Sequence, residues 1–193
     1  LLVFGNLSGK GASKYAKQHK SFFKINEKEI IKIIRSATDI LNKESGENPY
    51  LLHEELEKNM QKNVGIIRNK KKLELGIKNI EKLKDKYQSV KASGASQFNP
   101  GWHEALAMRN LLITSEAVAK SALIREESRG AHTREDFPGE RETGYLYNTI
   151  IYKDESDNMC IKKEGRKQPD DELKRIAEST LDTLEQEVKK ERE

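Results

Sequence analysis

Residues 99–138, NPGWHEALAMRNLLITSEAVAKSALIREESRGAHTREDFP, decide the fold, because a long helical period runs directly into a charged segment. The period extends from Gly101 to about Ser128 and predicts a helix roughly 40 Å long at 1.5 Å per residue. We expect this helix near the middle of a bundle, because both of its sides are apolar. One broad face carries Trp102, Ala105, Leu106, Leu112, Ile113, Leu123 and Ile124, and most of the opposite side carries Met108, Leu111, Val118, Ala119 and Ala122.

Charged residues interrupt the broad apolar face. On a helical wheel they fall within about 40° of one another; they are Arg109, Glu116, Lys120 and Glu127. In one interpretation their stems pack while their heads reach water, with Glu116 and Lys120 paired across one turn. In the other, they form a buried or interface-facing ion network whose partners come from neighbouring elements. The residues alone favour the first interpretation, since charged side chains are seldom fully buried.

The earlier segments predict shorter helices separated by polar loops. The first runs from Leu1 to about His19, and its small residues suggest close packing against another backbone. Asn26 begins the second helix with a capping-box spacing, Asn48 begins the third, and the fourth runs from about 69 to 87 as a solvated outer helix. Their apolar stripes are Ile30, Ile33, Ile34, Ala37 and Leu41, then Leu52, Leu56, Met60 and Val64, then Leu73, Ile77, Ile80, Leu83 and Tyr87.

After the charged segment the pattern becomes extended. YLYNTIIYK (145–153), the turn DESDN and MCIKKEG (159–165) predict a β-hairpin, which needs a surface to lie on. From Pro169 a helical stripe returns, too short to assert a coiled coil. The fold class is therefore mostly α: an antiparallel helical bundle of three to five helices, a small β-hairpin and a C-terminal helix. We divide the chain into a bundle domain (1–128), a charged motif loop with the hairpin extension (129–168) and a C-terminal helix (169–193).

Composition and charge narrow the function classes. Lys and Arg number 36 against 32 Asp and Glu, and only RNKKK (68–72) is densely basic, so we expect no nucleic-acid partner. No apolar run approaches the roughly 18 residues of a membrane span, so we expect no direct span. Cys160 is the single cysteine, which favours a reducing cytoplasm. The chain begins with Leu1 rather than methionine, which suggests a piece cut from a longer polypeptide.

The charged segment 127–138 admits several kinds of site. A metal-dependent hydrolase using His132, Glu135 and Asp136 is weakly supported, because no second histidine or cysteine lies near them. No glycine-rich dinucleotide or triphosphate fingerprint occurs. The segment is therefore either a loop that caps the long helix, with Arg129 and Arg134 holding carboxylates, or a surface for a partner absent from this chain.

The same residues carry a resemblance. The stretch 99–138, above all ESRGAHTREDFP at the end of a long helix, resembles the flavoprotein subunit of succinate dehydrogenase and fumarate reductase, in the helical domain that follows its flavin-binding domain. LLVFG (1–5), NPYLLHEELEKNMQKNVGIIR (48–68) and YLYNTIIYK (145–153) are similar to other parts of that domain. The resemblance covers Leu1 to about Lys167, and the segment from Asp171 onward matches poorly.

The resemblance implies an oxidoreductase that interconverts succinate and fumarate with FAD. In that family FAD is held through a histidine far upstream, and the groups that bind substrate and move the proton also lie upstream. No catalytic, cofactor-binding or metal-binding residue therefore carries over to this chain, which we expect to be inactive and free of FAD on its own. The implied partners are the upstream flavin-binding domain of the same polypeptide and the iron–sulfur subunit. The implied location is cytoplasmic, peripheral at the inner face of the cell membrane through partner subunits.

The resemblance also places the charged segment at a seam with the flavin domain or the iron–sulfur subunit. Arg129, His132 and Arg134 are expected to be charge-assisted clamps there, with Glu127 and Asp136 as their partners. The competing hypothesis is a stand-alone helical protein-interaction module. An upstream reading frame with a glycine-rich flavin fingerprint would distinguish the two.

Overall fold

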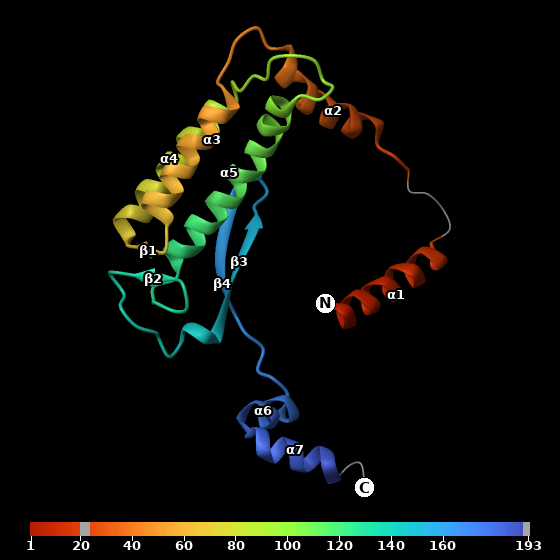
Figure 1. The fold of residues 1–193 in the computed structure, drawn as a ribbon, viewed down its shortest axis with the longest axis vertical. Coiled ribbons are helices and arrows are strands. Elements are labelled where there is room, and N and C mark those ends of the chain that lie inside the picture. Colours follow the sequence, from red (N-terminus) through yellow and green to blue (C-terminus); the bar gives the residue numbers. More distant parts are fainter. Residues whose placement is uncertain (20–23, 191–193) are drawn as a thin grey trace.

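Three antiparallel helices, α3, α4 and α5, form the centre of the computed structural model, which describes residues 1–19 and 24–190, with side chains to residue 186 (Figure 1). The helices are α1 (Leu2–Gln18), α2 (Glu27–Asn42), α3 (Pro49–Asn59), α4 (Lys70–Tyr87), α5 (Pro100–Ile124), α6 (Asp171–Glu178) and α7 (Leu181–Lys190). The strands are β1 (Ile67–Arg68), β2 (Thr133–Arg134), β3 (Tyr147–Lys153) and β4 (Met159–Gly165), and the shorter turns are η1 (Met60–Val64, a π-helix) and η2 (Gly144–Leu146, a 3-10 helix). The mostly α fold with a small hairpin is confirmed.

Helix α5 is the central element, as predicted, but its buried side differs from the wheel. It packs against α3 and α4, with the C-terminal end of α2 and the hairpin on its other sides. Ile113, assigned to the broad face, is 44% exposed. The residues that are buried come from both assigned faces: Ala105, Met108, Leu112, Glu116, Ala119 and Ala122. The buried residues of α5 therefore form a single stripe at helical spacing, because α3 and α4 cover only one side of this helix.

Asparagine side chains set where the central helices begin. Asn48 accepts the Tyr50 N–H at 2.9 Å, and Asn99 accepts the Trp102 N–H at 2.9 Å. Asn26 likewise accepts from the backbone of Glu29, so the predicted N-caps at Asn26 and Asn48 are confirmed. These contacts satisfy N–H groups that have no partner within the helix.

A buried amide network holds α3 to α4. Helix α3 widens into the π-helical η1, which turns Asn63 inward to donate to Asn59 Oδ1 at 2.8 Å. Asn79 donates to the same oxygen at 2.9 Å, and Asn59 donates to the Gly76 carbonyl at 3.0 Å. A β-carbon at Gly76 would press against Val64, so glycine permits the close approach of the two helices.

The two N-terminal helices differ from the bundle. The prediction that α1 packs closely is wrong in this structure, because α1 lies apart from the bundle and none of residues 1–19 is buried (Figure 1). On α2, Ile40 is buried near the bundle, and Trp102 Nε1 donates to the Ala37 carbonyl at 2.8 Å. The apolar stripe nearer the start of α2 faces outward instead: the exposed fractions are 42% for Ile30, 62% for Ile33 and 54% for Ile34.

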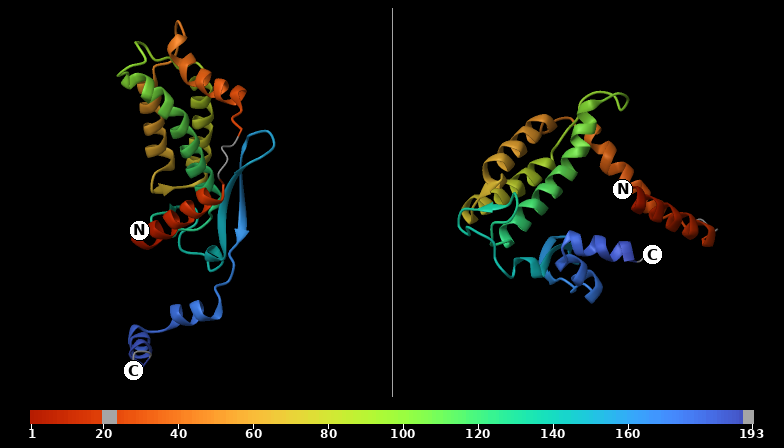
Figure 2. Two further views of the ribbon diagram at one scale, coloured as in Figure 1. Left: turned by 90° about the vertical axis from the view of Figure 1, so that its right-hand side faces the viewer. Right: turned by 60° about the horizontal axis from the view of Figure 1, so that its bottom comes forward.

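The hairpin lies beside the second half of α5, as the two views of Figure 2 agree. Strands β3 and β4 pair antiparallel, with Ile151 opposite Ile161. The predicted C-terminal helix is divided into α6 and α7, because the Thr180 hydroxyl accepts from the Thr183 backbone and starts a new helix. Residues 191–193 lie outside the described part, and no helix in that part is long and apolar enough to cross a membrane.

Candidate functional site

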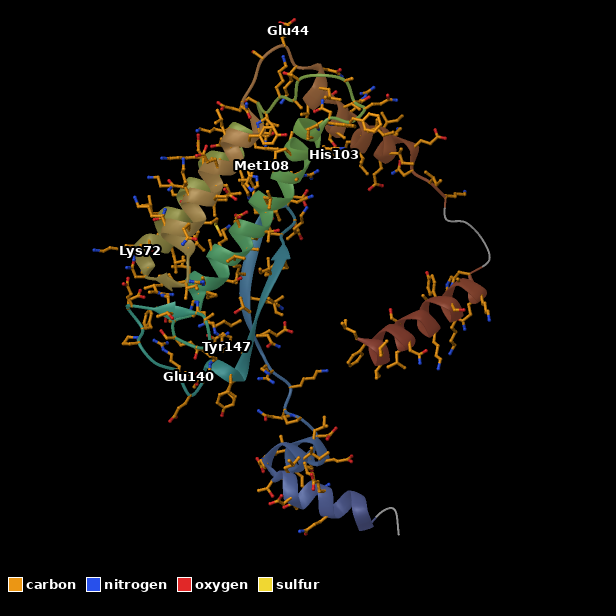
Figure 3. All side chains as sticks on the ribbon, viewed as in Figure 1. Glu44, Lys72, His103, Met108, Glu140 and Tyr147 are labelled. Carbon is orange, nitrogen blue, oxygen red and sulfur yellow. The ribbon has the colours of Figure 1, made fainter. Side chains whose placement is uncertain are left out.

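The charged segment forms a loop beneath α5, on the side of the molecule where Figure 3 labels Lys72, Glu140 and Tyr147. Helix α5 ends at Ile124 rather than near Ser128, so the predicted length is wrong. Arg125 turns into extended geometry, with φ −87° and ψ 96°. The chain then returns past the start of α4, where β2 pairs in parallel with β1. The loop therefore joins the ends of two helices.

Arg134 closes the C-terminus of α5 and explains its early end. Its side chain is 1% exposed, and Nη1 donates to the carbonyls of Ala122, Leu123 and Arg125 at 3.0, 3.0 and 3.2 Å. Its Nε and Nη2 bind the two oxygens of Asp136 at 2.8 and 2.9 Å. These bonds hold the pKa of the Asp136 carboxyl well below its ordinary value. A fixed cation at the negative end of a helix is electrostatically favourable.

Glu127 is the second buried group of the loop, at 1% exposure. Its Oε2 accepts from Arg129 Nε at 3.2 Å and from the Arg141 N–H at 3.1 Å, and Arg125 Nη2 lies 2.7 Å from Oε1. Burial alone would raise the pKa of this carboxyl, but the Arg141 amide and the Arg129 and Arg125 cations lower it below its ordinary value. A β-carbon at Gly144 would overlap the carboxylate, so any larger residue there would force the Glu127 side chain to move.

His132 fastens the loop to β1. Arg68 Nη1 donates to His132 Nδ1 at 3.1 Å, and His132 Nε2 donates to the Arg125 carbonyl at 3.0 Å. Beside it, the Thr133 N–H donates to the Ile66 carbonyl at 3.2 Å. The ring is half-buried. It is a hydrogen-bonded bridge between β1 and the end of α5.

The residues of the metal hypothesis take separate partners. His132 binds Arg68, Glu135 accepts from Asn69 at 2.7 Å, and Asp136 is held by Arg134. Within the described ranges, no group of three or more His, Cys, Asp or Glu residues is arranged to hold a metal ion. Each of these three side chains is therefore engaged by a different partner within the chain.

A second ion network runs through the middle of α5. Glu116 is 5% exposed and pairs with Lys84 of α4 and with Lys120, whose Nζ lies 2.6 Å away. Lys120 also donates to the Met159 carbonyl at 3.3 Å, which ties the hairpin to α5. The two lysines lower the pKa of Glu116 although burial opposes them. The network interpretation thus holds for Glu116, whereas Arg109 is exposed.

The structure brings the predicted clamp residues together in two ion pairs, Glu127 with Arg129 and Asp136 with Arg134. His132 joins the same loop to Arg68 of β1. Sequence reasoning missed Arg68, Arg125 and Gly144, which complete the cluster. Arg68 ends the run NVGIIR, which carried part of the resemblance, and that was a signal. Contacts between Gly144 and Glu127 depend on the tertiary path of the loop, which no local pattern encodes.

Comparison with known proteins gives a consistent result. A family described as "Fumarate reductase flavoprotein C-term" matches residues 53–188. The fumarate reductase (CoM/CoB) of Methanothermobacter marburgensis has a subunit that is 36% identical over 144 residues, which cover 72% of this chain and 25% of that protein. The succinate dehydrogenase flavoprotein subunit of Coxiella burnetii is 38% identical over 109 residues, covering 56% of this chain and 19% of that protein.

Solved structures agree with the sequence comparison. A chain of the Mycobacterium smegmatis Sdh1 complex with UQ1 superposes with a TM-score of 0.81 and 34% identity, covering 92% of this chain and 30% of that one. The apo form of that complex gives a TM-score of 0.80 and 35% identity, with 87% of this chain and 29% of that one covered. The chain therefore spans between about a fifth and a third of the length of these relatives.

Proposed function

Because this chain belongs to the family of fumarate reductase flavoprotein C-terminal domains, we propose that it is the helical scaffold of a subunit that interconverts succinate and fumarate. The observation that carries the proposal is the family match over residues 53–188, together with the shared fold. The two relatives described above are named as a fumarate reductase (CoM/CoB) subunit and a succinate dehydrogenase flavoprotein subunit, and the chain corresponds to only part of each.

We place FAD outside this chain, in the rest of the full-length polypeptide. The pyrophosphate of a dinucleotide is usually held by free N–H groups at a helix N-terminus after a glycine-rich turn. In five of the described helices, α2 to α6, a side chain of this chain already accepts a hydrogen bond from these N–H groups. The accepting residues are Asn26, Asn48, Asn69, Asn99 and Asp170. No step of the redox chemistry is assigned to this chain.

The role of the charged loop is that of an internal clamp. Glu127 and Arg134 are each 1% exposed, and the ion pairs and hydrogen bonds of both groups lie within the chain. A residue buried in this way shapes a partner-facing surface rather than touching the partner itself. Arg129, with 32% of its side chain exposed, pairs with Glu127 and Glu140 and is the member best placed to meet a neighbour.

We assign the contact with the preceding part of the subunit to α2. Its C-terminal half is anchored in the bundle through Ile40, whereas its isoleucine face (Ile30, Ile33 and Ile34) continues the same stripe without cover. An apolar stripe that is half buried and half exposed gains free energy when a second surface extends the core over it. The proposal also includes an iron–sulfur partner subunit and a peripheral position at the inner face of the cell membrane, which rest on the resemblance given above.

The test uses the complete subunit. Changing Ile30, Ile33 and Ile34 together to Ser should reduce retained FAD and succinate–fumarate turnover, because the flavin domain loses its apolar support. The matched control changes three exposed apolar residues outside α2 to Ser and should leave both unchanged; they are Leu75, Ile113 and Val118, at 49%, 44% and 44% exposure. Full flavin retention and turnover in the α2 variant would contradict the docking assignment. A complete gene product without any succinate–fumarate activity would contradict the function.

A further inference from the structure

The ring of His132 has both nitrogens committed and its protonation state fixed by its neighbours. Arg68 Nη1 donates to Nδ1 at 3.1 Å, and a guanidinium has only donors, so Nδ1 must accept. The proton therefore sits on Nε2, which donates to the Arg125 carbonyl at 3.0 Å. Only a neutral ring makes both bonds.

The surroundings of His132 are strongly cationic. The loop carboxylates are already engaged, since Asp136 binds Arg134 and Glu127 lies between arginines. Burial lowers the pKa of His132 below its ordinary value of 6.5, and the nearby guanidinium charges lower it further, against the opposing effect of the bond to the Arg125 carbonyl. The cations that act on the ring from the neighbouring elements are Arg68 on β1, Arg125 after α5 and Arg134 on β2.

We propose that His132 is a proton-sensitive latch. It fastens the charged loop to β1 while its ring is neutral, and it releases the loop from β1 when Nδ1 takes a proton from solvent. Protonation turns Nδ1 from an acceptor into a donor that faces the donors of Arg68, so the bond is lost and two cations are brought together. The proposal concerns the loop alone and does not depend on the reaction of the complete subunit.

The pairing between β1 and β2 is short enough for one side chain to control it. Strands β1 and β2 pair over two residues, held by Thr133 N–H to Ile66 O at 3.2 Å and Glu135 N–H to Arg68 O at 2.9 Å. Because the folded pKa of His132 lies below the unfolded value, the latch is fully closed above about pH 6.5. Its stabilisation is lost as the pH falls from there towards the folded pKa.

Hydrogen exchange of the Thr133 and Glu135 amides in this chain tests the latch. Their protection factors should fall between pH 7.5 and pH 5, by about tenfold for each pH unit separating the folded and unfolded pKa values. In His132→Gln, the amide oxygen accepts from Arg68 and the amide nitrogen donates to the Arg125 carbonyl. This variant should keep the protection and lose its pH dependence. The exposed His103→Gln is the matched control and should behave as wild type.

Direct observation of the ring keeps the test decisive if the Gln variant does not fold. The 15N shifts of His132 in the wild-type chain should report a neutral ring with the proton on Nε2 at pH 7. The ring should titrate below pH 6.5, at the acid end of the range over which protection is lost. A His132 ring that is charged at pH 7, wild-type protection that is unchanged down to pH 5, or an equal pH dependence in His132→Gln would each overturn the latch.

Discussion

Ile80 on α4 is 0% exposed, whereas Ile33 on α2 is 62% exposed, although both belong to apolar stripes at the same helical spacing. The difference is in what surrounds them. Helix α4 lies against α3 and α5, while the first half of α2 extends beyond the bundle (Figure 1). The helical spacing of apolar residues therefore identifies the face of a helix that is suited to burial. Whether that face is buried depends on the neighbouring elements that this chain provides.

The buried charged groups of the bundle and its loop are also enclosed by this chain. In the bundle and its loop, the buried charges of Glu116, Glu127 and Arg134 are paired inside the chain. Such pairs are tolerated because each ion has fixed partners. The buried charges of the bundle and its loop thus have partners within this chain, whereas the isoleucine face of α2 is exposed. Substitutions and changes of pH test that division, in order of decreasing effect.

The largest effect is expected for Arg134→Ala. The change leaves the carbonyls at the end of α5 and the Asp136 carboxylate without their cation, so the free energy of unfolding should fall by about 3–5 kcal/mol. Urea denaturation of this chain measures it. Arg35→Ala, on the exposed side of α2, should cost no more than about 0.5 kcal/mol. Equal losses in the two variants would show that Arg134 is not a clamp.

Two isoleucine truncations compare the bundle with α2 directly. Ile80→Ala creates a cavity in the core and should cost about 2–5 kcal/mol, whereas Ile33→Ala should cost about 0.5 kcal/mol or less in this chain. Thermal or urea unfolding of both variants gives the difference. A large loss in Ile33→Ala would mean that this chain already covers the α2 face.

A smaller effect is expected at Gly144. Replacing it by Ala forces a methyl group against the buried Glu127 carboxylate, which should cost about 1–3 kcal/mol through overpacking. Gly165→Ala provides the control, because nothing lies within 4 Å of its added β-carbon. If both variants unfold at the wild-type urea concentration, the close packing of Gly144 on Glu127 is wrong.

The smallest effect is an acid dependence. Because Arg134 holds the folded pKa of Asp136 below its ordinary value of 3.8, this carboxyl contributes stability above that value and loses it as the pH falls. Melting temperatures between pH 2 and pH 6 should therefore decline less steeply in Asp136→Asn than in wild type. Part of the decline should remain through Glu127, whose pKa is also lowered. Identical profiles would remove Asp136 from the acid response.

The sequence predicted the helices and their starts well because those depend on local chemistry. Asn26 and Asn48 are N-caps through contacts within three residues. The sequence did not predict features that depend on contacts between distant parts of the chain. The end of α5 depends on Arg134, which reaches back from the loop, and the burial of Glu116 depends on Lys84 of another helix. The clamp residues were identifiable by type, and a loop that caps the long helix was one of the two alternatives that the sequence left open. The burial of Glu127 beside Gly144 was not predicted.

We expect the bundle with its charged loop to fold fully within this chain, and the isoleucine face of α2 to be covered only in the complete subunit. Hydrogen–deuterium exchange of this chain and of the complete subunit tests it most directly. We predict that amides in the first half of α2 gain protection in the complete subunit, while those of α3, α4 and α5 keep the same protection in both. Unchanged exchange in α2, or a bundle that becomes protected only in the complete subunit, would contradict the account.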